Sequence, residues 1–600
     1  MSKRLSKMGW LVLVALLSLA LVILPACAAP AEEEEEEEQA GIPYKNDGIF
    51  VQETIGEIDT LDPAWCYDTA SGEALYYMYE GLLGYDGTAT NKFVGLCADT
   101  WTIAPDSLSI TFHIRPNVKF SNGDVMTPED VEYSLERHLV TDPYSNYGPM
   151  WILLYAILNV YTTDPSEGIT GEDIDNAIEI VNGDSVRINL VRPYPMDTLQ
   201  QMLCGSWADI VSKKFCIENG DWPGTWDNWR DWNDPEKEEL KLHQIAMGTG
   251  PWALEVWEQP GQIKFVKNQY YWKGANTVPF DRIIIKYVDE WASRKLSLQA
   301  GDADLVYCPR TNIHDLDDVV GVQAIKDLPE LTIDAFYFNF AIAEGCPYIG
   351  SGKLDGNGIP LDFFTDADVR KGFNYAFDWA KYIEQAMQGE AAQRGSPIVY
   401  GLPYFNPDAR MYSYDTAKAK EHLQAAWGGQ VWEKGFAFTL IYNAGNIVRK
   451  TACEILAENL ARINNKFKVS VLPVVWAGTL ATIRSKSWAM FQIGWLADYA
   501  DPDNFAVPYM HSTGTFSGPA SYNNPEVDAL IVEGSLETDP AKRQEIYYKI
   551  QDFWYTDAPG IMIAQPLGRR FFTQYIHGFY FNPTTCGQPG PLYYMTKSAS

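Results

Sequence analysis

The sequence predicts a mixed α/β protein built from several domains. Short segments in which polar and apolar residues alternate, a strand pattern, are interspersed with segments of helical periodicity. The chain has 600 residues, which exceeds the size of a single ordinary hydrophobic core. Hydrophobic residues make up 46% and charged residues 21%, a composition typical of folded proteins. We find no internal repeat, and this argues against a solenoid.

The strongest local signals lie at residues 109–131. Residues 109–115 alternate in polarity and predict a strand. Thr127 then provides a helix cap, followed by Pro128 in the first helical position and acidic residues in the first turn. Further strands are expected at residues 185–190, 262–266, 282–288, 332–340, 468–475 and 489–495, and further helices at residues 291–300, 366–388, 450–463 and 538–557.

The first forty residues resemble an export signal. Basic residues precede an apolar run at residues 10–24, and small residues follow it. Cys27 stands where a bacterial lipoprotein signal carries its lipidated cysteine. Two residues before it, Pro25 departs from the small or hydroxyl residue usual in such signals. We expect a signal peptide at residues 1–26, lipid attachment at Cys27 and an acidic, lipid-anchored linker at residues 27–40. An uncleaved membrane anchor or an ordinary signal peptide is the alternative.

Charge and motif content exclude several classes of function. The net charge of −33 argues against a nucleic-acid partner, because phosphate binding requires Lys and Arg. The seven histidines are scattered without metal-ligand spacing, and no phosphate loop, dinucleotide fingerprint or nucleophile motif is found. We therefore predict no cofactor, no metal and no catalytic residue. Cys204 and Cys216 are close enough in sequence for a disulfide, and buried free thiols are the alternative.

Four segments, in order along the chain, resemble the large extracytoplasmic solute-binding proteins of peptide, dipeptide and nickel ABC transporters. The most specific reads TFHIRPNVKFSNGD at residues 111–124, followed by TPEDV at residues 127–131. The others are YEGL at 79–82 with LCADTW at 96–101, GTGPW at 248–252 with NQYYW at 268–272, and WLADYADPDNF at 495–505 with YNNPEVD at 522–528. Each is weak alone, but the ordered set is specific.

This resemblance implies an α/β, two-lobed periplasmic-binding-protein-like fold (type II, cluster C) with a ligand cleft between the lobes. The first lobe would be discontinuous, at residues 41–84, 206–320 and 556–600. An extra subdomain would occupy residues 85–205, and the second lobe residues 321–555.

The resemblance also implies a function. The chain would be a monomeric, non-enzymatic component of an ABC importer outside the cytoplasm, attached to the membrane by its lipid. It would capture dipeptides or oligopeptides and deliver them to a membrane permease with a separate ATPase. The same scaffold binds oligosaccharides, nickel chelates and other solutes, and a secreted hydrolase is the alternative from a different class.

The fourth segment carries the candidate site residues. In the resembled peptide binders, an aspartate of the W-x-x-D stretch pairs with the α-ammonium of the peptide, and Asp498 occupies that position. The alternative is that Asp498, Asp501 and Asp503 form an exposed acidic turn. Trp495 would either stack on the ligand or pack in the core. Arg484 would meet a ligand carboxylate or form a surface ion pair.

Overall fold

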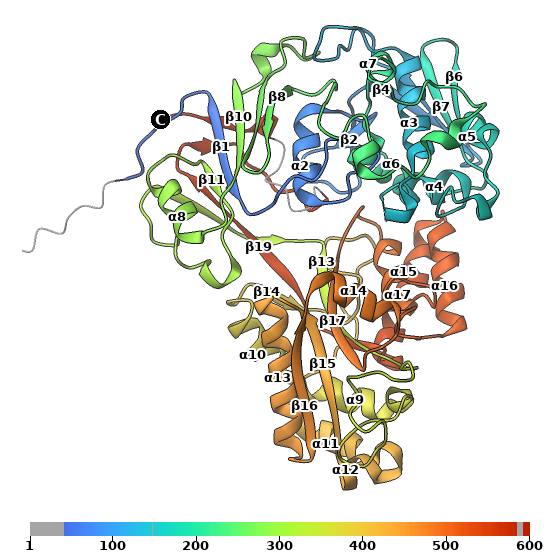
Figure 1. Ribbon diagram of the computed structural model, residues 1–600, viewed down its shortest axis with the longest axis vertical. Coiled ribbons are helices and arrows are strands. Elements are labelled where there is room, and N and C mark those ends of the chain that lie inside the picture. The colour runs from blue at the N-terminus through green and yellow to red at the C-terminus, as the bar shows by residue number, and fades with distance from the viewer. Residues whose placement is uncertain (1–40, 147, 585–591, 600) are drawn as a thin grey trace, which may run out of the picture. The chain divides into compact units, whose positions relative to one another are not determined.

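A computed structural model describes residues 41–146, 148–584 and 592–599 of the chain (Figure 1). The predicted signal peptide, Cys27 and the acidic linker lie outside the described residues, as does Cys586. No helix among the described residues is long and apolar enough to cross a bilayer.

Eight of the described strands form a mixed sheet, which is the centre of the first lobe. Its middle strand, β1 (Ile49–Thr54), runs parallel to β10 (Arg282–Tyr287) on one side and to β11 (Leu305–Val306) on the other. The strand order is β12-β19-β11-β1-β10-β9-β8, and β14 pairs with β19. The other elements of this lobe are α2 (Thr69–Met78), β2 (Leu83–Tyr85), β3 (Phe93–Gly95), α7 (Lys213–Glu218), β8 (Trp252–Glu258), β9 (Gln262–Lys267), α8 (Trp291–Gln299), β12 (Val322–Pro329), β14 (Ala391–Gln393), β19 (Ala564–Thr573), β20 (Ile576–His577) and β21 (Thr596–Lys597).

The subdomain follows β3 in the chain. Four of its described strands form a sheet in the order β4-β5-β7-β6, in which neighbouring strands are antiparallel. The predicted strand and capped helix are confirmed as β5 (Ser109–Ile114) and α3 (Pro128–Thr141). Thr127 and Asp130 form a capping box at the start of α3, in which the N–H of Thr127 donates to the Asp130 carboxylate (2.9 Å). The remaining elements are β4 (Ala98–Ile103), α4 (Trp151–Leu158), α5 (Gly171–Ala177), β6 (Ile178–Val181), β7 (Ser185–Asn189) and α6 (Met196–Met202).

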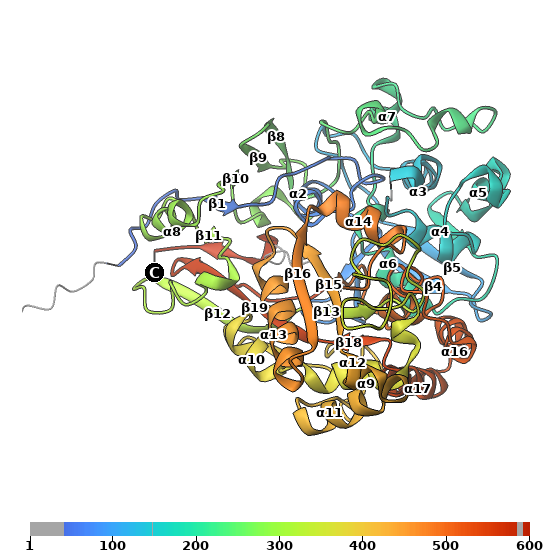
Figure 2. The same ribbon diagram turned by 60° about the horizontal axis from the view of Figure 1, so that its bottom comes forward.

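The second lobe has a five-stranded sheet in the order β16-β15-β17-β13-β18 (Figure 2). Its strands are β13 (Thr332–Phe338), β15 (Phe436–Asn443), β16 (Phe467–Val474), β17 (Met490–Leu496) and β18 (Gly560–Met562). Its helices are α9 (Ala367–Ala376), α10 (Trp379–Gln385), α11 (Thr416–Ala425), α12 (Gln430–Lys434), α13 (Ile447–Ile463), α14 (Trp476–Arg484), α15 (Asp503–Met510), α16 (Pro525–Leu536) and α17 (Pro540–Asp557).

One helix prediction is wrong in its length. The single helix predicted at residues 366–388 is two helices, α9 and α10. The break occurs because Asp378 caps a new helix, and its carboxylate accepts from the N–H of Lys381 at 3.0 Å.

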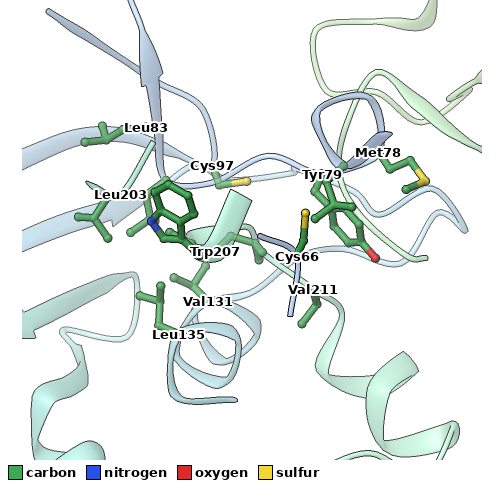
Figure 3. Packing of buried hydrophobic residues seen from close by; sticks show 14 of the residues in the cluster. Cys66, Met78, Tyr79, Leu83, Cys97, Val131, Leu135, Leu203, Trp207 and Val211 are labelled. Atoms are coloured by element: carbon green, nitrogen blue, oxygen red, sulfur yellow. The ribbon is translucent and has the colours of Figure 1, made fainter. Parts of the chain in front are cut away.

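The first lobe and the subdomain share one hydrophobic core. Figure 3 shows part of this core, in which Tyr79 and Leu83 of the first lobe belong to the same cluster as Val131 of α3 and Trp207, which follows α6. In the second lobe, side chains of β13 alternate between two cores. Phe336 contributes to the core under α9, α10 and α13, whereas its neighbours in sequence face the core under α15, α16 and α17.

Two direct connections join a strand of the first sheet to a strand of the second. The chain passes from β12 to β13 through residues 330–331, and from β18 to β19 through Ile563. Residues 560–562, which the predicted boundaries place in the first lobe, pair with β13 in the second sheet. Residues 322–329 and 391–393, which the predicted boundaries place in the second lobe, pair with β19 in the first sheet. The remaining boundaries stay a prediction. Two short crossings of extended chain form the kind of hinge about which two lobes can close.

Candidate functional site

A cavity of about 460 Å³ lies between the two lobes. Its volume falls in the range of small-molecule sites, ~300–1,000 Å³. The first lobe and subdomain contribute residues from the start of α2, from Tyr85 and from the loop after α6. The second lobe contributes residues 494–498, at the end of β17. The described lining includes two acids, Asp68 and Asp498, and no Lys, Arg or His, so the cavity favours a ligand with a positive charge.

Asp498 is the carboxylate on the second-lobe wall of this cavity. It accepts a hydrogen bond from the side-chain amide of Asn504 at 2.9 Å and another from Tyr67 of the first lobe. No Lys, Arg or His of the described chain lies within 4.0 Å of its oxygens. Burial raises the pKa of Asp498 to about 6, and the two neutral donors offset only part of that effect. The site therefore holds a carboxylate that lacks a cation.

The other two predicted site residues lie in different places. Trp495 lines the cavity, and its indole N–H donates to Asn504 at 3.0 Å while its ring packs edge-on against Phe516. It thus serves the core and the cavity wall together. Arg484 is exposed at the end of α14 and is not among the residues lining the cavity.

The alternative of an exposed acidic turn is wrong for Asp501 and Asp503, which are 1% and 3% exposed. Both oxygens of Asp501 accept hydrogen bonds from Arg543 of α17, at 2.7 and 2.8 Å. Thr198 of α6 donates to the same carboxylate at 2.7 Å. Burial opposes ionisation of Asp501, but Arg543 outweighs it and lowers its pKa. This ion pair therefore also joins the second lobe to the subdomain.

Neighbouring groups reinforce that junction. Tyr499 lies in the hydrophobic core of the first lobe, and its hydroxyl donates to Asp503 at 3.4 Å. Burial, and next the charge of Asp501, raise the pKa of Asp503 well above the usual range. Burial and the charge of Asp501 therefore disfavour ionisation of Asp503, whereas Arg543 favours the ionised form of Asp501. Sequence alone does not distinguish these two acids, which are two residues apart.

Several cavity residues are missed by sequence reasoning. Tyr67, Tyr76 and Tyr85 from the first lobe and Trp207 from the loop after α6 all line the cavity. They belong to no motif, and the only available signal is the dense run of aromatic residues around α2. Their role follows from the way α2 and the loop after α6 are brought together by the shared core (Figure 3).

The disulfide between Cys204 and Cys216 does not form, because both thiols are free. Cys204 follows α6, where its thiol donates to the carbonyl of Gln200 at 3.2 Å. Cys216 is buried in α7. The alternative of buried free thiols is correct for Cys216, whereas Cys204 is only half-buried.

Comparison with known proteins identifies the family. The sequence model described as "Bacterial extracellular solute-binding proteins, family 5 Middle" matches residues 92–517. The chain belongs to this family of solute-binding proteins. The predicted resemblance is confirmed, and so is the two-lobed α/β fold.

Curated relatives match almost the whole binding protein. Heme-binding protein A of Haemophilus influenzae is 26% identical over 576 residues, covering 94% of this chain and 96% of that protein. Oligopeptide-binding protein OppA of Bacillus subtilis is 24% identical over 507 residues, covering 83% and 84%. The names differ in the solute, so the family alone does not define the ligand.

A solved structure supports the fold of the binding protein. The periplasmic binding protein DppA of Helicobacter pylori, in complex with the peptide STSA, superposes with a TM-score of 0.67 and 21% identity. The match covers 92% of this chain and 98% of that one. At this identity, the likeness establishes the architecture, and the ligand has to be argued from the cavity.

The pKa of Asp498 predicts a pH-dependent gain of stability on neutralising it. A carboxyl whose pKa is raised in the folded state binds more protons there, so stability falls as pH rises from about 4 to about 6. Asp498→Asn should therefore stabilise the ligand-free protein at pH 8 by at most ~3 kcal/mol and have little effect at pH 4. Calorimetric unfolding at both pH values measures this, with the exposed Glu344→Gln as the control. An equal shift at both pH values would contradict the assigned pKa.

Proposed function

We propose that the protein is the substrate-binding component of an ABC importer and captures peptides in the interlobe cavity. The observation that carries this proposal is Asp498, a carboxylate of the cavity wall with neutral hydrogen-bond donors and no cation nearby among the described residues. The α-ammonium of a peptide supplies the missing charge. A charge-assisted hydrogen bond of this kind contributes about 1.5–3 kcal/mol net.

The cavity favours peptide over heme and over oligosaccharide. Heme carries two carboxylates, and the described lining includes two acids and no base to receive them. Oligosaccharides would use Trp207 and Trp495 as stacking surfaces but do not require the charge of Asp498. Aromatic walls beside the Asp498 carboxylate suit a ligand held by its terminus and backbone, with tolerance for its side chains.

The family and the N-terminal sequence support the wider role that we propose. The protein acts without catalysis, as a monomer outside the cytoplasm, and the closed form docks on a permease whose separate ATPase supplies energy. A lipid on Cys27 attaches it to the membrane, and the seven glutamates of the linker keep the body away from the anionic surface.

Peptides with and without a free amino terminus test the binding site. Calorimetry should show that short alanine peptides bind at least ~10-fold more tightly than their N-acetylated forms, because only the free amine pairs with Asp498. Asp498→Asn should remove most of this preference, whereas Glu344→Gln should preserve it.

Equal affinity for free and acetylated peptides would show that Asp498 does not bind the amino terminus of the peptide. Mass spectrometry of the incubated peptides separates binding from hydrolysis, since the proposal requires intact peptide and fragments would contradict it. Tight binding of oligosaccharide but not of peptide would contradict peptide binding and support a sugar-binding function.

The lipid anchor has its own test. Metabolic labelling with a radioactive fatty acid should label the wild-type chain and not Cys27→Ser, because the thiol of Cys27 is the attachment point. Membrane fractionation should then place the wild type in the pellet and the variant in the soluble fraction. Equal labelling, or none in either chain, would contradict the anchor without affecting the peptide site.

A further inference from the structure

A second, smaller cavity of about 120 Å³ adjoins the interlobe cavity. Tyr76, Tyr85, Cys204 and Ser206 line both cavities, so these residues stand at the boundary between the two spaces. The volume far exceeds the ~10–15 Å³ that a single water requires. We call this space, within the first lobe beside the cleft, the side pocket.

The side pocket contains a buried carboxylate that has no hydrogen-bond donor among the described residues. Asp209 lies on its wall and is 7% exposed, and its pKa shift has no hydrogen-bond contribution. The nearest comparable group, Glu80, is satisfied. Its carboxylate accepts from Thr249 at 3.1 Å, Tyr271 at 3.0 Å and Trp272 at 2.9 Å.

Charge in the side pocket is unbalanced. Among the described lining residues, Glu80 and Asp209 are accompanied by one cation, Lys273. Its ammonium lies over the rings of Trp272 and Tyr593, at 4.8 and 5.0 Å from the ring centres. Lys273 makes no ion pair within 4.0 Å with any described acid. Burial, together with the charge of Glu80, raises the pKa of Asp209 well above its usual range. An incoming cation would relieve this cost.

The walls of the side pocket suit an organic cation. Seven of its described lining residues are tyrosines. Aromatic ring faces attract ammonium groups, and the attraction grows when water is excluded. The hydrocarbon part of an alkylammonium chain also packs well against such rings. A pocket lined by tyrosines and by the Asp209 carboxylate fits a long aliphatic chain with a terminal positive charge.

We propose that the side pocket receives the cationic side chain of a bound peptide, such as that of lysine, and places its ammonium beside Asp209. This proposal rests on peptide binding in the interlobe cavity. Asp498 then holds the amino terminus in the main cavity, while Asp209 selects among side chains. The preferred ligand is therefore a peptide with at least two positive charges.

Paired peptides containing lysine or norleucine test the proposal, because the two side chains have similar length and only lysine carries the charge. The pair is made at each position of an alanine tripeptide in turn, and affinity is measured by calorimetry. At one position, the lysine peptide should bind at least ~10-fold more tightly than the norleucine peptide. Asp209→Asn should abolish that difference while leaving the affinity for the norleucine peptide unchanged.

Control variants separate the two proposals. Asp142→Asn neutralises another buried carboxylate, outside the lining of both cavities, and should keep the lysine preference. Asp498→Asn should weaken both peptides by the same factor. If lysine and norleucine peptides bind equally at every position, or if Asp209→Asn keeps the preference, the side-pocket proposal is overturned and peptide binding stands. If neither peptide binds, both proposals are overturned.

Discussion

The ion pair between Asp501 and Arg543 is the interaction on which the site depends. It is buried, bidentate and shared with Thr198 of the subdomain. Asp501 lies three residues after Asp498, so the same contact that joins the lobes also fixes the cavity-wall turn. Losing either partner would leave an uncompensated charge in the interior, which is strongly destabilising. The position of the cavity carboxylate is thus a consequence of a structural ion pair.

Three aspartates within six residues have three different environments. Arg543 lowers the pKa of Asp501 against the effect of burial, whereas burial and the charge of Asp501 raise the pKa of Asp503. Asp498 has a pKa of about 6 because burial is only partly offset by hydrogen bonds from Asn504 and Tyr67. Environment, and not residue type, therefore separates the structural acids from the one available to a ligand.

The sequence predicts elements far better than it predicts the site. The capping box at Thr127 and the alternation in β5 depend only on residues close in sequence. Both elements could therefore be predicted correctly from the sequence. The break at Asp378 is not apparent from the sequence, because the helical pattern continues on both sides of the capping residue. Tyr67 and Asp209 could not be predicted, since each acquires its role from segments distant in sequence that the shared core brings together.

The central claim is that the amino terminus of a peptide binds Asp498 in the cavity between the lobes. A crystal structure of the protein grown with an unmodified alanine peptide tests it most directly. The account predicts peptide enclosed by residues of both lobes, with its ammonium within hydrogen-bonding distance of the Asp498 carboxylate. Peptide outside this cavity, or inside it with its carboxylate end toward Asp498, would contradict the account.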